Sequence, residues 1–311
     1  MKHLSIIVPC YNEQEVIRES YRRTVLVMNA LDIPSQIIYI NDGSHDNTRQ
    51  ILNEIADNDS RVKVLHFSRN FGHQPAVAAG INKCNTDLAV IMDADLQDPP
   101  ELIPQILELQ ERENANVVYC VRRSREGDNF FKRITAKIFY RMMNSMSEVK
   151  FPLDTGDFRL IDRKIMNQFN QFHERSKYIR GLISWIGFKQ VPFYYRHENR
   201  VAGKTKYPLN KLFQLAAIAF IYFSNKPLRL AINLGFTAVI VGIVLAAWFT
   251  LGKIYGFSNA EPGWTAIITV ITFFGGVQLL TLGILGHYIG VLFDETKARP
   301  EYIIDEERNF Q

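Results

Sequence analysis

Two long uncharged stretches near the carboxyl end most constrain how this chain can fold. Leu230–Leu251 and Trp264–Gly286 contain no Asp, Glu, Lys or Arg. A helix needs about 20 predominantly apolar residues to cross the hydrocarbon core of a bilayer, and each stretch is long enough. A buried helix pair in a soluble protein is the alternative. The lengths favour a transmembrane hairpin over residues 230–286, with spans at 230–251 and 264–286.

The charges around these stretches predict the orientation of the hairpin. Cationic residues flank it on both outer sides, at Lys211, Lys226, Arg229, Lys297 and Arg299. The segment between the spans carries only Lys253 and Glu261. Because cytoplasmic loops are enriched in Lys and Arg, we expect an integral membrane protein with both termini in the cytoplasm.

The composition places limits on the rest of the chain. Its 311 residues have room for one large domain and an appendage. A net charge of +4 is too modest for a protein that wraps a polyanion, so no nucleic-acid partner is expected. Cys10, Cys84 and Cys120 lie in or beside apolar runs without metal-ligand spacing, which indicates buried, reduced thiols.

Before the hairpin, short apolar runs alternate with helical patterns. The runs that we predict to be strands are Leu4–Pro9, Gln36–Asn41, Val62–Phe67, Leu88–Met92, Asn116–Arg122 and Gln190–Tyr195, with a further strand-like run beginning at Asp157. This alternation is typical of an α/β fold with a mostly parallel sheet and flanking helices. We assign residues 1–207 to this cytosolic domain and 287–311 to a cytosolic tail. Residues 208–229 have the pattern of an interfacial amphipathic helix, although packing against the sheet is a competing interpretation.

One strand end is unusually acidic. The buried run Leu88–Met92 is followed by Asp93, Asp95 and Asp98, with Gln97 among them. Ligands of open α/β sheets bind beyond the carboxyl ends of the strands, and paired carboxylates suit a divalent cation that also holds phosphate oxygens. Solvated acids at a strand end are the alternative. An EF-hand does not fit, because the loop lacks the required Gly and follows a strand.

Other predicted strands also end in polar residues. Glu13, Asp42 and Arg69 each lie just beyond one, where helix capping alone could explain any of them. Their recurrence at successive carboxyl ends favours a ligand site. No GxGxxG follows a strand, which argues against a dinucleotide fold, and Gly203-Lys204-Thr205 imitates only the end of a P-loop.

Four of these segments carry a family resemblance. They are Pro9-Cys10-Tyr11-Asn12-Glu13, Asn41-Asp42-Gly43-Ser44, Ser68-Arg69-Asn70-Phe71-Gly72 and Asp93-Ala94-Asp95-Leu96-Gln97-Asp98. They resemble the successive motifs of family 2 glycosyltransferases of GT-A fold, and more narrowly the polyprenyl-phosphate enzymes: bactoprenol glucosyltransferases and dolichol-phosphate mannose synthases. The stretch Asp154-Thr155-Gly156-Asp157-Phe158-Arg159-Leu160 and the two-span tail extend the resemblance over nearly the whole chain. One departure is His73-Gln74, where relatives often carry Lys-Glu.

The resemblance implies roles for individual residues. Those expected at the donor nucleotide sugar are Pro9, Tyr11, Glu13, Asp42, Asp93, Gln97, Arg122 and Arg133, the last two from a basic loop that closes over the donor. Asp93 and Asp95 would hold Mg²⁺ or Mn²⁺ at the diphosphate. Asp95 and Asp157 are the expected catalytic acids, and whether Asp157 acts as a base or only orients stays open.

The expected reaction moves one sugar from a nucleotide diphosphate sugar, UDP-glucose or UDP-N-acetylglucosamine, to undecaprenyl phosphate at the bacterial cytoplasmic membrane. Arg200 and Lys204, in a basic loop before the interfacial helix, are the expected contacts of the acceptor phosphate. A processive polysaccharide synthase would need a Gln-x-x-Arg-Trp motif and more spans, and neither is present. A non-catalytic membrane scaffold would have no reason to keep these acids. The strand-like run Pro300–Asp305, together with the tetramers that relatives form, suggests a homo-oligomer.

Overall fold

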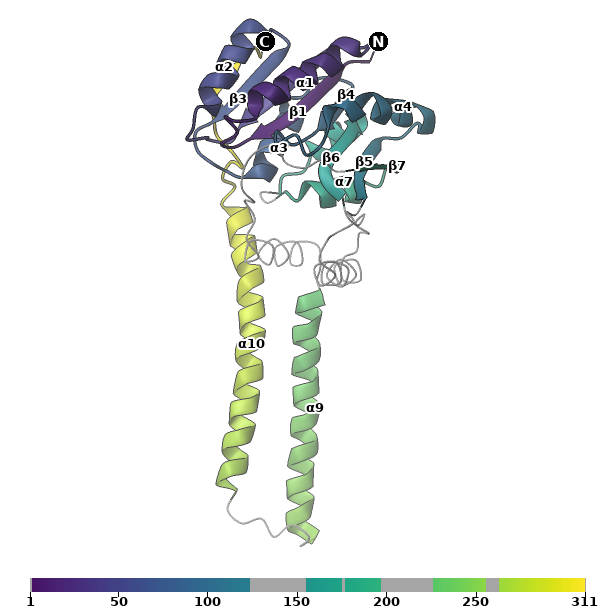
Figure 1. Cartoon of the computed structure of the whole chain (residues 1–311). Coiled ribbons are helices and arrows are strands. Elements are labelled where there is room, and N and C mark those ends of the chain that lie inside the picture. The colour runs from purple at the N-terminus through teal and green to yellow at the C-terminus, as the bar shows by residue number, and fades with distance from the viewer. Residues whose placement is uncertain (1, 124–154, 175–176, 197–225, 256–262, 311) are drawn as a thin grey trace. The chain divides into compact units, whose positions relative to one another are not determined.

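The computed structural model describes residues 2–123, 155–174, 177–196, 226–255 and 263–310 (Figure 1). They form two compact units. The first contains the described residues up to 196 together with 299–310, and the second contains 226–255 and 263–298.

An eight-stranded sheet forms the centre of the first unit, in the order β7-β5-β6-β4-β1-β2-β3-β8. The strands are β1 (Leu4–Cys10), β2 (Ser35–Asn41), β3 (Val62–Phe67), β4 (Leu88–Ile91), β5 (Val117–Arg123), β6 (Thr155–Asp162), β7 (Gln190–Arg196) and β8 (Ile304–Arg308). The first five and β7 confirm the predicted strands to within a residue or two. The Ile, Val and Leu side chains of β1 to β4 are buried on both faces, as parallel strands covered by helices require.

The sheet is mostly parallel, as predicted, with two strands reversed. The pairs β1–β2, β1–β4, β2–β3 and β5–β7 are parallel, but β6 runs antiparallel to both β4 and β5, and β8 antiparallel to β3. The chain therefore enters β6 at the edge of the sheet where β4 and β5 end. This reversal places Asp157, near the start of β6, at the same edge as the acids that follow β4.

Helices cover the sheet of the first unit. They are α1 (Ile17–Ala30), α2 (Thr48–Asn58), α3 (His73–Lys83), η1 (Pro100–Leu102), α4 (Ile103–Glu113), α6 (Arg163–Phe169) and α7 (Ile179–Ile186). Helix α3 approaches the sheet closely at Gly80, where an added Cβ would lie 2.4 Å from Cγ2 of Ile7. This close approach explains a glycine in the middle of a helix, where it otherwise costs about 1 kcal/mol.

The last residues of the chain belong to this sheet and not to a separate tail. Beside the β8–β3 ladder, the backbone N–H of Ser68 donates to the carbonyl of Ile303 at 3.1 Å. The ring of Tyr302 stacks on Phe67 with centroids 5.1 Å apart. Arg49 of α2 pairs with Asp305 at 2.7 Å and with Glu306 at 2.8 Å. The predicted separation of 287–311 from the first domain therefore does not hold for its final part.

The second unit consists of two long helices that contact each other, α9 (Lys226–Tyr255) and α10 (Trp264–Thr296). Among the residues described, Phe273–Thr296 is long and apolar enough to cross a membrane, and Ala231–Val244 is a shorter apolar segment. Large apolar side chains such as Phe236 and Leu279 are 70% and 72% exposed. Residues 226–229 of the predicted interfacial helix form the start of α9, and 208–225 lie outside the described residues.

We expect Tyr302→Ala to lower the free energy of unfolding of the first unit by about 1–3 kcal/mol, because it removes an aromatic ring packed on Phe67. The measurement is chemical denaturation of the detergent-solubilised protein. Ile303→Ala is the matched control, since this neighbouring side chain is 52% exposed and its backbone contact remains. Equal effects of the two substitutions would show that the stacked ring does not stabilise the attachment of β8.

Candidate active site

The loops that follow β1 and β2 are joined by hydrogen bonds. The backbone N–H of Asn12, at a positive φ of 53°, donates to Oγ of Ser44 at 3.0 Å, and the N–H of Glu13 donates to Oγ1 of Thr48 at 2.9 Å. Tyr11 meets the ring of His45 edge-on, with centroids 6.4 Å apart. These contacts place the half-buried Tyr11 and Glu13 beside the Asp42 loop, as the sequence predicted for parallel strands that end at one edge. Pro9 is buried within β1.

Asp42 organises the next loop along this edge. Its carboxylate is only 3% exposed and accepts the backbone N–H groups of Phe71 at 2.7 Å and Gly72 at 3.0 Å. Burial raises the pKa of Asp42, while these two hydrogen bonds oppose the rise. The observed role of this side chain is therefore to hold the loop 68–72 in place, whatever contact it also makes with a ligand.

The turn after Asp42 depends on a glycine. Gly43 has φ +62°, and a Cβ added there would lie 2.3 Å from the carbonyl carbon of Arg69 and 2.5 Å from the backbone nitrogen of Asn70. Backbone atoms cannot move aside as the end of a flexible side chain can. The Asp42 loop and the loop after β3 thus approach as closely as they do because position 43 has no side chain.

The acidic loop after β4 is shaped by its own contacts. Leu96 is fully buried at a positive φ of 60°, and the N–H of Gln97 donates to Oδ1 of Asp95 at 3.1 Å. Asp98 is also fully buried and accepts a hydrogen bond from the hydroxyl of Tyr195, at the end of β7. The sequence places Asp98 within the acidic motif but predicts no role for it. Its partner is distant in the sequence, so no local signal predicts this anchor.

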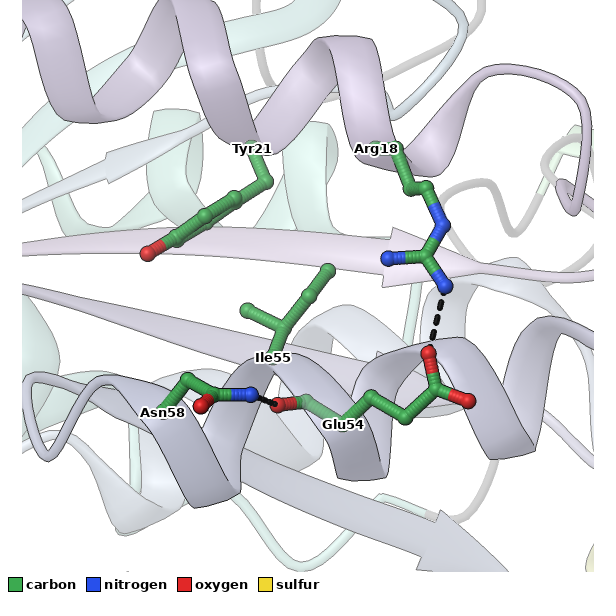
Figure 2. A pocket seen from close by; sticks show the side chains of 5 residues that line it. All are labelled: Arg18, Tyr21, Glu54, Ile55 and Asn58. Carbon is green, nitrogen blue, oxygen red and sulfur yellow. Dashed lines mark hydrogen bonds and ion pairs between the residues drawn. The ribbon is translucent and has the colours of Figure 1, made fainter.

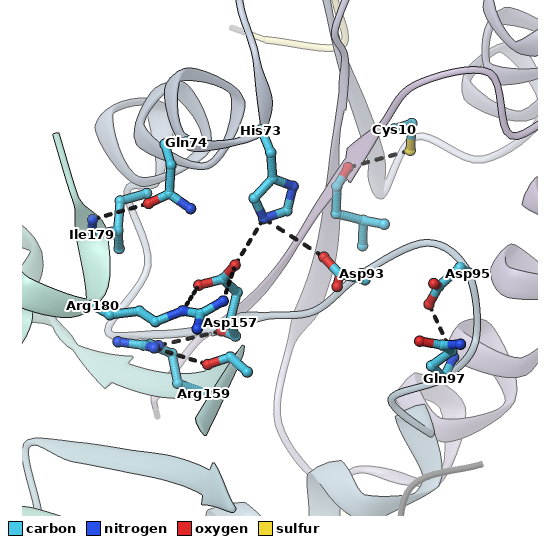
Figure 3. Close-up of polar contacts among 12 residues, drawn as sticks. Cys10, His73, Gln74, Asp93, Asp95, Gln97, Asp157, Arg159, Ile179 and Arg180 are labelled. Carbon is cyan, nitrogen blue, oxygen red and sulfur yellow. Dashed lines mark hydrogen bonds and ion pairs between the residues drawn. The ribbon is translucent and has the colours of Figure 1, made fainter. Parts of the chain in front are cut away.

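Three charged side chains meet in front of Asp93. Nε2 of His73 lies 3.1 Å from Oδ2 of Asp157 and 3.7 Å from Oδ1 of Asp93. Arg180 donates from Nε to Oδ1 of Asp157 at 2.7 Å and from a terminal nitrogen to Oδ2 at 3.1 Å. Figure 3 shows this cluster, with Asp95 turned toward Gln97 and away from it. Strand β6, the loop after β4 and helices α3 and α7 thus each bring charged side chains to this edge.

The charges in this cluster perturb one another. Burial opposes ionisation of Asp157, but Arg180 and His73 outweigh it and hold its pKa well below the usual range. Burial also disfavours the charged form of His73, yet Asp157 and Asp93 raise its pKa to about 9. For Asp93, burial is the largest effect and nearby carboxylates add to it, so its pKa rises to about 6. Asp157 is therefore a weak proton acceptor. Around Asp93, the nearby positive charge does not offset burial and the neighbouring carboxylates.

A divalent cation bound at Asp93 would offset the uncompensated negative charge there. The described residues contain no group of three or more His, Cys, Asp or Glu side chains arranged to hold a metal ion. Asp93 and Asp95 could supply two carboxylates, and a cation of the Mg²⁺ type is commonly bound by one or two carboxylates plus substrate phosphates and water. The residues present therefore fit a cation that arrives with a diphosphate, rather than one caged by protein alone.

A pocket elsewhere does not involve these residues. It has a volume of about 440 Å³ between α1 and α2 and is lined by Arg18, Tyr21, Glu54, Ile55 and Asn58 (Figure 2). Arg18 forms an ion pair with Glu54, and Asn58 donates to the backbone carbonyl of Glu54 at 2.6 Å. The polar groups thus pair with one another, and nothing there calls for a ligand.

Some predicted site residues cannot be placed. Arg133, Arg200 and Lys204 lie outside the described residues, and Arg122 is described only as backbone in β5. Conversely, the sequence predicts no role for His73 or Arg180. His73 directly follows the Ser68–Gly72 motif, which is a usable signal, whereas Arg180 lies in a helix whose pattern indicates only packing.

We expect Gly43→Ala to reduce the free energy of unfolding by more than about 3 kcal/mol, because strain at positive φ adds to a backbone collision. Gly187→Ala is the matched control. Gly187 has φ +79°, but its added Cβ would have no neighbour closer than 3.7 Å, so only the conformational cost of about 1–2 kcal/mol should appear. Denaturation curves of both variants measure the difference, and equal losses would contradict the close approach at position 43.

Comparison with known proteins agrees with the motifs. Residues 5–169 match the model of Glycosyl transferase family 2. The uncharacterized glycosyltransferase YkcC of Bacillus subtilis is 43% identical over 97% of this chain and 93% of its own length. The bactoprenol glucosyl transferase of Shigella phage SfV is 36% identical over 98% of this chain and 99% of its own.

Among solved structures, glucosyl-3-phosphoglycerate synthase from Mycobacterium tuberculosis is 17% identical, with a TM-score of 0.47 over 71% of this chain and 78% of its own. That likeness is too distant to support an assignment. The family model covers more than half of the chain, and the relatives cover nearly all of it. The chain belongs to family 2 of the glycosyltransferases.

Proposed function

We propose that this glycosyltransferase moves a single sugar from UDP-glucose or UDP-N-acetylglucosamine to undecaprenyl phosphate, yielding a lipid-linked phosphosugar for modification of cell-envelope glycans. The observation that carries the proposal is the similarity to bactoprenol glucosyl transferases, which extends over 98% of the chain, apolar helices included. A relative that shared only the catalytic domain would say less about the acceptor.

The donor end of the site is assigned to the loops after β1, β2 and β4. Tyr11, Glu13 and Asp42 would surround the nucleoside, with Pro9 beneath them, and Gln97 would lie beside the diphosphate. Mg²⁺ or Mn²⁺ held by Asp93 and Asp95 would stabilise the charge that builds on the departing nucleoside diphosphate. Arg122 and Arg133 are proposed to contact the same phosphates, because guanidinium groups match phosphate oxygens.

The acceptor phosphate would attack the anomeric carbon in line, with inversion. It forms the new C–O bond as the bond to the nucleoside diphosphate breaks, and that group leaves with the electron pair. A phosphate monoester is already ionised near neutral pH, since its second pKa is about 6, so no strong general base is required. The low pKa of Asp157 is consistent with an orienting role. Arg200 and Lys204 are proposed to guide the lipid phosphate.

The membrane attachment is proposed from the second unit. Helices α9 and α10 would form a transmembrane hairpin in the bacterial cytoplasmic membrane, with the catalytic domain and both termini in the cytoplasm. The apolar segment Phe273–Thr296 and the exposed apolar side chains along α9 support this arrangement. Residues 208–225 would lie at the interface, and a homo-oligomer is the proposed assembly.

The test is a transfer assay with full-length protein in detergent, undecaprenyl phosphate and a panel of radiolabelled nucleotide sugars. We expect one labelled monosaccharide in the lipid extract, from UDP-glucose or UDP-N-acetylglucosamine. A polymer would indicate a processive synthase, and the absence of labelled lipid with every donor would refute the proposed acceptor.

The metal assignment has its own prediction. Asp95→Asn should reduce turnover at least about a hundredfold, because an amide replaces a charged ligand of a hard cation and a few kcal/mol of stabilisation are lost. EDTA should abolish the transfer activity of the wild-type protein, and added Mg²⁺ or Mn²⁺ should restore that activity. Asp87→Asn is the control, since Asp87 precedes the same strand at its opposite end. Full activity in EDTA would exclude a dependence on divalent cations.

A further inference from the structure

His73 lies between two carboxylates that come from different strands. Its Nε2 is 3.1 Å from Oδ2 of Asp157 and 3.7 Å from Oδ1 of Asp93 (Figure 3). An ionised carboxylate can only accept hydrogen bonds, so a ring nitrogen that faces two of them must carry a proton. The tautomer is thereby fixed in either charge state: Nε2–H donates to Asp157, and the Asp93 carboxylate lies 3.7 Å from the same nitrogen, beyond hydrogen-bond length.

The imidazole is held from both ends. On the backbone side, Gly72 and Phe71 donate their N–H groups to the buried Asp42, so the residue that follows them begins α3 at a fixed place. On the side-chain side, Asp157 is itself held by two hydrogen bonds from Arg180. His73 is thus a pre-positioned donor rather than a mobile surface side chain.

Asp157 has both carboxylate oxygens occupied by these donors. Oδ1 accepts from Arg180, and Oδ2 accepts from Arg180 and His73. A carboxylate in this state is poorly suited to take a proton, but it is well suited to orient an imidazole, as carboxylates do behind many ligand-binding histidines.

We propose that His73 is a positioning residue of the transfer reaction: its ring, oriented by the hydrogen bond to Asp157, lies 3.7 Å from the Asp93 carboxylate and by electrostatic attraction keeps that carboxylate in the orientation that receives the cation–diphosphate group of the donor. Asp157 then acts through His73. The inference rests on the proposed function only in taking Asp93 as a ligand of that group. Partners of ligating carboxylates matter because their loss typically costs 10–100-fold in metal affinity or activity.

The first test measures Mn²⁺ binding by electron paramagnetic resonance to full-length protein in detergent with saturating UDP and no acceptor, so that no turnover occurs. Gln can place an amide N–H about where Nε2 lies, whereas Asn reaches only about as far as Nδ1. We expect His73→Ala and His73→Asn to weaken Mn²⁺ binding about tenfold or more. His73→Gln should stay close to the wild type, as should the control His3→Ala, an exposed histidine at the amino end.

Several results would overturn the proposal. One is an Mn²⁺ affinity that is unchanged or tighter in His73→Asn, and another is an equal loss in the Gln and Asn variants. Failure of the wild-type UDP complex to bind Mn²⁺ would also overturn it. If the wild type binds Mn²⁺ with UDP but transfers nothing to undecaprenyl phosphate, the proposed acceptor is wrong, while the Mn²⁺ titrations still decide the role of His73.

The second test asks whether Asp157 acts through His73. In a double-mutant cycle on Mn²⁺ affinity and on kcat, Asp157→Asn should add no further loss to His73→Ala, because the residue through which it acts is gone. Losses that multiply in the double variant would show that Asp157 acts independently and would overturn this step. Thermal unfolding of each variant identifies any that fails to fold, in which case the Gln and Asn comparison decides.

Discussion

The candidate site depends on two buried carboxylates whose hydrogen bonds come from the protein itself. Asp42 holds the loop after β3 through two backbone N–H groups, and Asp157 is held by Arg180 and His73. A buried carboxylate is costly unless its oxygens accept hydrogen bonds or meet a cation. Both therefore hold their donors in place, because moving a donating segment away would leave a buried carboxylate without its hydrogen bonds. The loop 68–72 and helices α3 and α7 are placed relative to the sheet edge in this way.

A second pair of carboxylates is in a different condition. Asp95 accepts the N–H of Gln97, and Asp93 has His73 at 3.7 Å, beyond hydrogen-bond length. The raised pKa of Asp93 reflects burial and neighbouring acids that local cations do not fully offset. The uncompensated negative charge at Asp93 attracts a ligand that brings positive charge to this edge and repels a bare anion. A diphosphate accompanied by a divalent cation meets both conditions.

How far the sequence predicts this arrangement depends on the range of the interactions. Strands such as Val62–Phe67 are recovered from the sequence because a continuous apolar run bounded by polar turns is a local signal. The clustering of Glu13, Asp42 and Asp93 follows from a general property of parallel strands. The reversal of β6 and the pairing of β8 cannot be predicted in this way, because the partner of a strand is determined by residues far away in the sequence. The role of Arg180 could not be predicted for the same reason, because its contact with Asp157 forms only when β6 and α7 pack together.

The attachment of β8 also bears on how the chain crosses a membrane. The strands β1–β7 precede the two long helices, and β8 follows them, yet all eight strands form one sheet. A sheet cannot be divided by a bilayer, so the chain between β7 and β8 must cross an even number of times. If Phe273–Thr296 crosses, a second crossing must occur between residues 197 and 272, and α9 is the long apolar helix described there. Given that crossing, the connectivity supports the proposed hairpin, and it accounts for why α9, whose apolar segment Ala231–Val244 is shorter, would still be required to span.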